Sequence, residues 1–470
     1  MNPSKPCAEK KIHYQHPKDF ECRRMNGPRA KTDLIVQGCF VHSTPNESLV
    51  VNEDMVMGVR GGRILFMEPK DKLDALLCSF EMDKENLMTL EKNQFIIPGF
   101  VDSHAHAPQY TFMGTGGDLP LIPWLQTYTY PTETLLNTDD SFARDVYEKC
   151  VNRTLRNGST TVSYYATISA DATRILTDVI ECQGQRAFIG KVNMDTNSPD
   201  DYVETLEESV KETHRFVEDI LARKNPLLTP CITPRFAGSC THELMEDLGK
   251  IARGHSLPIQ THISENRDEV KMIADMFPQA KNYTDVYDRA GVLGDKTILA
   301  HGVYLSDEEL QVIGERGSGI SHCPNSNFTL KSGILDVRKV MNAGIKLGLG
   351  TDFAGGHSPS MLDAIRRGVT AANTLTFSQR SDQGQLELVT YKDLFRLATL
   401  GSAELMGISD QIGNFEVGKQ LDALVIDPEV DQSPFDVFST DSREDIIQKF
   451  LFVGDDRNIV KVFVNANQVV

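Results

Sequence analysis

The sequence predicts an α/β protein in which a parallel (β/α)8 barrel is flanked by a composite β-sandwich domain built from the N- and C-terminal segments. Eight short strand-like runs that alternate with helical stretches predict the barrel. Strand-like, turn-rich segments at both ends of the chain predict the composite domain. With 470 residues the chain is long enough for more than one domain.

The N-terminal segment divides into two parts. Residues 1–31 mix Pro, Lys, Arg and His with few apolar positions, which predicts a flexible leader. Residues 32–95 form the N-terminal part of the composite β domain, with the polar triplet 52–54 as a turn and residues 70–77 as a short helix. The strand-like runs of this part are residues 34–36, 49–51, 55–59 and 64–66.

Residues 96–400 carry the repeated order of strand, loop and helix that is typical of the barrel. The expected strands are residues 96–103, 160–165, 187–193, 227–233, 257–263, 297–303, 319–322 and 346–350. The helical stretches between them include residues 141–156, 202–222, 241–254 and 307–316. In such a barrel, catalytic side chains gather at the carboxyl ends of the strands.

Residues 401–470 return to strand character and complete the β domain. A helix is expected over residues 393–406, and strands over residues 421–426 and 459–464. We expect these strands to pack with the N-terminal ones beside the barrel.

Composition narrows the class of partner. The formal net charge of −18 disfavours nucleic acid and anionic membranes as partners. No apolar run approaches the roughly 18 residues of a membrane span, and the polar N-terminus lacks the apolar core of a secretory signal. Nine scattered cysteines fit reduced thiols better than a disulfide framework. We therefore expect a cytoplasmic protein that acts on a small molecule.

Histidines and acids recur where the predicted barrel strands end. His104 and His106 are separated by one residue, so both imidazoles lie on one face of the first strand. Later strands end in His262, followed by Glu265, in His301 and in Asp352. A single histidine at a strand end is usually a hydrogen-bonded core residue, but imidazoles and a carboxylate together are the ligands of a divalent ion such as zinc.

The chain resembles the amidohydrolase superfamily over about residues 30–470. The resemblance rests on residues 98–110, 118–121, 233–236, 322–327, 348–356 and 413–419. Within the superfamily it is most similar to the guanine deaminases. This implies hydrolysis of guanine to xanthine and ammonia by a zinc-dependent homodimer.

The resemblance also assigns roles to individual residues. It implies that one Zn²⁺ per chain is bound by His104, His106, His262 and Asp352. The implied catalytic residues are Glu265, which would protonate N3 of the ring, and His301 and Asp352, which would handle the attacking water. The implied substrate-binding residues are His106, Gln109, Arg235, Phe236, His262 and Asp352.

Several alternatives stay open. Arg235 could be a surface or ion-paired arginine, and Phe236 a plain core aromatic. Trp124 is expected to pack within its own loop. Lys191 in the third strand raises the possibility of a carboxylated lysine bridging two metals, but its position in mid-strand favours one metal.

Rival functions remain within and outside the superfamily. The zinc-deaminase pattern H-x-E…P-C-x-x-C is absent, and Asp352 stands alone where adenosine deaminases have paired aspartates. The alternatives are a deaminase or chlorohydrolase acting on another purine, a pterin or a triazine, and a catalytically inactive scaffold.

Overall fold

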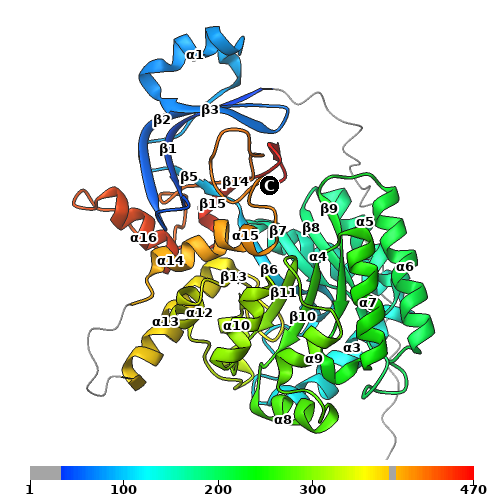
Figure 1. Cartoon of the computed structure of the whole chain (residues 1–470). Helices are drawn as coiled ribbons and strands as arrows, with labels where there is room; N and C mark the ends of the chain where they lie inside the picture. Colours follow the sequence, from blue (N-terminus) through cyan, green and yellow to red (C-terminus); the bar gives the residue numbers. More distant parts are fainter. Residues whose placement is uncertain (1–32, 380–387) are drawn as a thin grey trace, which may run out of the picture.

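The computed structural model describes residues 33–379 and 388–470 (Figure 1). The predicted flexible leader, residues 1–31, lies outside these residues. Two sheets organise the chain: an eight-stranded parallel sheet surrounded by helices, and a mixed eight-stranded sheet beside it. The predicted barrel and composite β domain are thereby confirmed.

The parallel sheet forms the barrel. Its strands, in spatial order, are β6 (Phe100–His106), β7 (Ser159–Tyr165), β8 (Arg186–Asn193), β9 (Leu228–Pro234), β10 (Ile259–Ile263), β11 (Thr297–His301), β12 (Gly319–His322) and β13 (Lys346–Leu349). Backbone hydrogen bonds close the ring just beyond β13, where the Asp352 N–H donates to the His104 carbonyl (2.9 Å) and the His106 N–H donates to the Phe353 carbonyl (3.1 Å). The closure therefore brings Asp352 beside the two histidines of β6.

Helices surround the barrel because each has one apolar face. They are α4 (Asp140–Arg156), α5 (Ala170–Gln183), α6 (Leu206–Ala222), α7 (His242–His255), α8 (Arg267–Met276), α9 (Tyr283–Arg289), α10 (Asp307–Glu315), α11 (Pro324–Thr329), α12 (Val337–Asn342) and α13 (Met361–Gln379). In α4 the buried residues recur every three to four positions, at Ala143, Val146, Tyr147, Cys150 and Val151. The predicted helix 202–222 begins later, at Leu206, because Thr205 and Glu208 form a capping box that fixes its first turn.

The mixed sheet joins the two ends of the chain. Its strands are β1 (Leu34–His42), β2 (Val50–Arg60), β3 (Arg63–Pro69), β4 (Leu87–Thr89), β5 (Phe95–Pro98), β14 (Ala423–Ile426), β15 (Ile459–Val464) and β16 (Asn467–Gln468). The C-terminal β14 pairs with β5, which pairs with β1 on its other side. Helices α1 (Leu73–Phe80), α14 (Tyr391–Arg396), α15 (Ser402–Leu405) and α16 (Arg443–Val453) accompany this sheet and the barrel base.

The predicted first barrel strand, residues 96–103, is in fact two strands. Residues up to Pro98 belong to the mixed sheet, and the barrel strand starts at Phe100. Between them the Gly99 N–H donates to the Asp422 carbonyl (2.9 Å), and a Cβ at Gly99 would lie 2.1 Å from the Thr160 hydroxyl. The close approach of Thr160 thus requires glycine where the chain passes between the sheets.

The predicted turn at residues 52–54 is wrong, because β2 runs through it without interruption. Glu53 and Asp54 together oppose the single residue Cys39 of β1, and Asp54 has φ 56°. This is a β-bulge, in which an extra residue is accommodated without ending the strand. The polar residues that signal a turn lie on the exposed part of the bulge.

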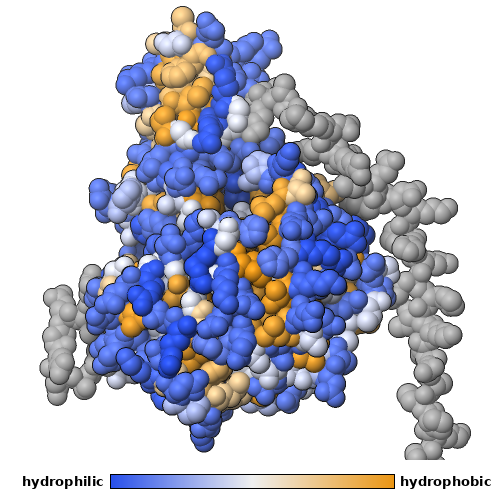
Figure 2. All heavy atoms as spheres, turned by 45° about the vertical axis from the view of Figure 1, so that its right-hand side comes forward, coloured by the Kyte–Doolittle hydropathy of each residue, from blue (hydrophilic) through white to orange (hydrophobic). Residues whose placement is uncertain are grey.

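The surface carries both hydrophilic and apolar residues. Figure 2 shows a face on which hydrophilic residues prevail, with apolar side chains gathered near the end that carries α1 and in a second stripe lower on the molecule. None of the described helices combines the length and the apolar character needed to cross a membrane.

Free thiols occur at Cys39, Cys78, Cys150, Cys231, Cys240 and Cys323. Cys182 is disulfide-bonded, contrary to the expectation of reduced thiols throughout.

Candidate active site

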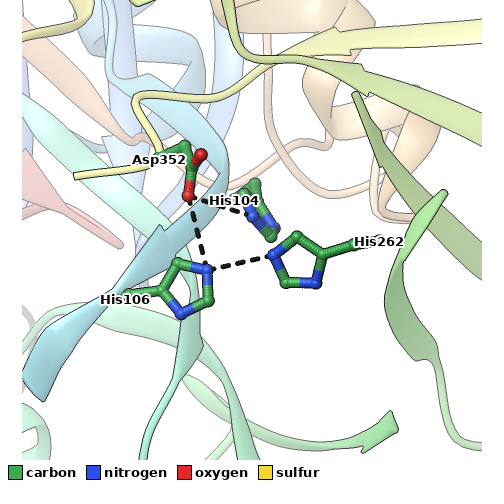
Figure 3. A group of neighbouring side chains, drawn as sticks. All are labelled: His104, His106, His262 and Asp352. Atoms are coloured by element: carbon green, nitrogen blue, oxygen red, sulfur yellow. Dashed lines mark hydrogen bonds and ion pairs between the residues drawn. The ribbon is translucent and has the colours of Figure 1, made fainter. Parts of the chain in front are cut away.

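Four predicted ligands meet at the carboxyl end of the barrel (Figure 3). One ligand atom from each of His104, His106, His262 and Asp352 lies within 4.8 Å of those of the others. The Asp352 Oδ1 atom is 3.2 Å from His104 Nε2 and 3.3 Å from His106 Nε2. The Nε2 atoms of His106 and His262 are 3.2 Å apart. Residues up to 248 positions apart in sequence thereby share one point in space.

Hydrogen bonds behind the imidazoles decide which nitrogen faces that point. His104 donates through Nδ1 to Gln260 Oε1 (2.7 Å), and His262 donates through Nδ1 to the Arg235 carbonyl (2.7 Å). Their Nε2 atoms therefore carry lone pairs toward the carboxylate of Asp352. His106 Nδ1 has no hydrogen-bond partner among the described residues, so no contact fixes which nitrogen of this ring carries the hydrogen. Three imidazoles and a carboxylate that converge in this way suit a divalent cation, so these residues can hold one.

Burial keeps His106 and His262 neutral. It lowers the pKa of His106 and His262 well below the usual value, and the neighbouring His104 lowers that of His262 further. Burial alone would raise the pKa of Asp352, but the surrounding imidazoles, His104 first, lower it overall. Neutral imidazole and ionised carboxylate are the forms that bind metal.

Glu265 and His301 lie beside the cluster. The Ser332 hydroxyl donates to Glu265 Oε1 (2.9 Å), and His301 Nε2 is 3.5 Å from Glu265 Oε2 and 3.6 Å from Asp352 Oδ2. His301 donates through Nδ1 to Asn327 Oδ1 (2.9 Å), which leaves a lone pair on Nε2. Burial, reinforced by the charge of Asp352, raises the pKa of Glu265 to about 8. Glu265 can therefore hold a proton at neutral pH and deliver it.

A cavity adjoins these groups. Its polar lining is formed by His106, Gln109, Arg235, His262, Glu265, Glu269, His301 and Asp352. Its apolar lining is formed by Leu121, Ile122, Trp124, Leu125, Phe236 and Leu330. Trp124 packs with Leu121 and Leu125 of its own loop, as expected, and it also contributes to the cavity wall. All the predicted site residues except His104 line the cavity, and His104 lies directly behind it in the cluster.

The structure bears on the alternatives that the sequence leaves open for Arg235 and Phe236. Arg235 is an ion-paired arginine, with Nη1 2.8 Å from Glu133 Oε2, and it also lines the cavity. Phe236 is partly buried rather than a closed core residue, and its backbone bridges to His262. Both residues are thus placed to contact a ligand.

Lys191 lies apart from the cluster. Its Nζ donates to Glu204 Oε2 (2.7 Å) and to the Val192 carbonyl (3.0 Å), and it does not line the cavity. An amine committed to this buried ion pair is not available as a bridge between metals.

Several polar residues next to the site were missed in the sequence, among them Glu269 in the cavity lining. Gln260 lies two positions before His262, so strand alternation alone places it on the same inward face. Asn327 belongs to the segment 322–327 that carries the resemblance. Ser332 and Glu133 lie outside any motif, and only the folded chain brings them to the site.

Comparison with known proteins agrees with this geometry. Residues 95–469 match the Amidohydrolase family. The chain is 48% identical to guanine deaminase of Mus musculus and to that of Homo sapiens, covering 93% of this chain and 96% of each relative. The crystal structure of guanine deaminase from C. acetobutylicum with bound guanine in the active site superposes with a TM-score of 0.85 at 32% identity, covering 93% of this chain and 100% of that one. The chain belongs to the amidohydrolase family, a family of metal-dependent hydrolases.

Proposed function

We propose that this enzyme hydrolyses guanine to xanthine and ammonia with one zinc ion per chain. The observation that carries the proposal is the convergence of three imidazoles and a carboxylate beside a proton-holding Glu265, in a cavity that Arg235 and Gln109 also line. The similarity to guanine deaminases over nearly the whole chain, one of them crystallised with guanine, supports the same substrate.

His104, His106, His262 and Asp352 are the residues that would hold the zinc ion. Their nitrogen and oxygen donors suit zinc, and the engagement of Lys191 by Glu204 supports a single ion. A zinc ion bound there lowers the pKa of a water molecule toward neutrality and so makes it a nucleophile.

The side chains divide the proton transfers between them. As the water oxygen adds to C2, Asp352 accepts one water proton through Oδ2, and His301 holds the water by a hydrogen bond to Nε2. Glu265 donates its proton to N3, where negative charge would otherwise accumulate. The proton on Asp352 then passes to the amino group, which leaves as ammonia when the C2–N bond breaks. The second water proton returns to Glu265, and the oxygen stays on C2 as the carbonyl of xanthine.

The cavity walls orient the ring for this attack. Arg235 donates to the O6 side, Gln109 hydrogen-bonds the purine edge, and Phe236 packs against the ring. His106, His262 and Asp352 border the ring at the reacting carbon. The proposal also includes the homodimer that the resemblance implies and the cytoplasmic location expected from the composition. Light scattering on the purified chain tests the homodimer.

The direct test combines metal analysis with an absorbance assay. We expect the purified chain to contain one zinc ion and to convert guanine to xanthine with release of ammonia. Adenine, pterins and chlorotriazines serve as competing substrates, and preferential turnover of any of them would replace guanine in the proposal. An absence of turnover with a full metal complement would favour an inactive scaffold.

The pH profile of turnover tests the acid. Because Glu265 acts in its protonated form, kcat should fall as the pH rises through the pKa of this group, which burial raises to about 8. A bound cation lowers that value, so the limb is expected at or below about pH 8. The measurement is kcat with saturating guanine across neutral and alkaline pH. A profile without an alkaline limb would contradict the acid role.

A further inference from the structure

Glu133 is a buried carboxylate that no motif singles out. It lies on α3 (Tyr130–Thr138), which follows β6 by way of a one-turn helix, α2 (Leu121–Trp124), and its side chain is fully buried. Four hydrogen bonds reach its two oxygens. Two come from Arg235, at 2.8 Å to Oε2 and 3.2 Å to Oε1. The others come from the Tyr202 hydroxyl (2.5 Å, to Oε2) and from Gln109 Nε2 (3.3 Å, to Oε1).

These donors include both polar residues that are proposed to recognise the purine. A carboxylate paired with a guanidinium is ionised and can only accept hydrogen bonds. Gln109 must therefore turn its amide NH2 toward Glu133, which leaves its carbonyl Oε1 for the cavity. Arg235 uses two N–H groups on Glu133, and its Nε–H has no hydrogen-bond partner among the described residues 33–379 and 388–470. The cavity wall thus offers donors from Arg235 and an acceptor from Gln109.

We propose that Glu133 is a positioning residue that sets the specificity of this site for a purine with a carbonyl at C6. The inference rests on the proposed function and deepens it. A 6-oxopurine presents a carbonyl acceptor beside the N1–H donor, which complements donors from Arg235 and an acceptor from Gln109. A 6-aminopurine presents the opposite pattern, a donor beside the N1 acceptor, and leaves buried groups unpaired.

Tyr202 reinforces the same orientation. Its hydroxyl accepts from the Ile168 N–H (3.3 Å), so its own hydrogen is free to donate to Glu133. The Tyr130 ring lies against Arg235, with the guanidinium carbon 5.5 Å from the ring centre. These contacts hold the carboxylate and the guanidinium in place before a ligand enters.

Glu133→Gln is the decisive variant because it changes one acceptor into a donor at constant size. The amide oxygen of the new side chain should occupy the Oε2 position, where Arg235 and Tyr202 both donate. Its NH2 group then takes the Oε1 position, so Arg235 Nη2 loses its acceptor there and the Gln109 amide has to flip and present NH2 to the cavity. At the edge of the cavity that faces N1 of the purine, a hydrogen-bond donor thereby replaces an acceptor.

The test compares binding of hypoxanthine and adenine to the zinc-loaded enzyme by calorimetry. Hypoxanthine has the 6-oxo edge but no 2-amino group to lose. We expect the parent enzyme to prefer hypoxanthine by about 100-fold or more, and Glu133→Gln to lower this ratio at least about tenfold. An unchanged ratio, with zinc content retained, would overturn the inference. Glu133→Asp keeps the charge but withdraws the carboxylate from Gln109, so it should also narrow the preference for hypoxanthine over adenine. If Glu133→Gln does not fold, the ratio in Glu133→Asp tests the inference instead.

Two controls separate specificity from general destabilisation. Glu204→Gln weakens another buried ion pair, that with Lys191, which faces away from the cavity, and it should leave the ratio unchanged. Tyr202→Phe removes one of the four donors to Glu133 but leaves those from Arg235 and Gln109, so it should narrow the ratio far less than Glu133→Gln does. A tenfold loss in either control would contradict the inference. Guanine turnover by the parent enzyme is measured on the same preparation. Its absence overturns the proposed function, whereas turnover with an unaltered ratio in Glu133→Gln overturns only the role of Glu133.

Discussion

Replacing Glu265 by Gln lowers kcat for guanine about 10²–10⁴-fold and leaves zinc bound. The amide has nearly the same shape and can keep the hydrogen bond from Ser332, but it has no proton to transfer to the ring. Glu265 is not among the four residues whose ligand atoms converge, so the metal should stay. Single-turnover kinetics and metal analysis on one preparation measure both effects.

The matched control is Ser332→Ala, which removes the hydrogen bond to Glu265 and keeps the carboxyl group itself. Its loss of turnover should be much smaller, because an acid that is less well held still carries a proton. Undiminished turnover by Glu265→Gln would remove the acid role. Loss of zinc from that variant would instead make Glu265 part of the metal site.

The barrel was predictable because strand and helix periodicity survive in every repeat, and the predicted strands overlap all eight that form. What the periodicity could not show is where one sheet ends and the next begins. Residues 95–106 read as one apolar run, and only the packing of Thr160 against Gly99 reveals that the chain changes sheets there. The bulge at Asp54 was misread for a similar reason, since polar residues signal a turn whether or not the strand continues beyond them.

The active site, like the fold, was predictable from the sequence only in part. His104, His106 and Asp352 were predictable because they stand at strand ends, and strand ends of a barrel meet. The residues that hydrogen-bond to the site residues could not all be inferred, because only the folded chain brings them together. Glu133 on α3 reaches Arg235, which directly follows barrel strand β9, from 102 positions away. The spacing of residues in the sequence does not reveal such a contact. Arg235 is both ion-paired and part of the cavity wall, so the two explanations of this residue hold together.

Removing the metal should abolish turnover and lower stability together. Without a cation, three imidazole nitrogens and a carboxylate oxygen are held within 4.8 Å of one another in a buried cluster that is built to surround a cation. A chelator-treated enzyme is therefore expected to lose activity and to unfold at a lower temperature. Restored zinc stabilises the folded state by mass action, by about 4 kcal/mol when free zinc is about 1,000 times its Kd. Activity and Tm are measured along one zinc titration.

The same titration counts the ions. Activity should saturate at one equivalent per chain, because the only lysine of the third strand is engaged by Glu204 and does not line the cavity. Lys191→Gln, which keeps a hydrogen-bond donor for Glu204, should bind the same single equivalent. A second equivalent needed for activity, and lost in Lys191→Gln, would show that this amine bridges two metals after all. Full activity in metal-free enzyme would contradict the role of the histidine cluster itself, since its buried lone pairs would then serve no cation in catalysis.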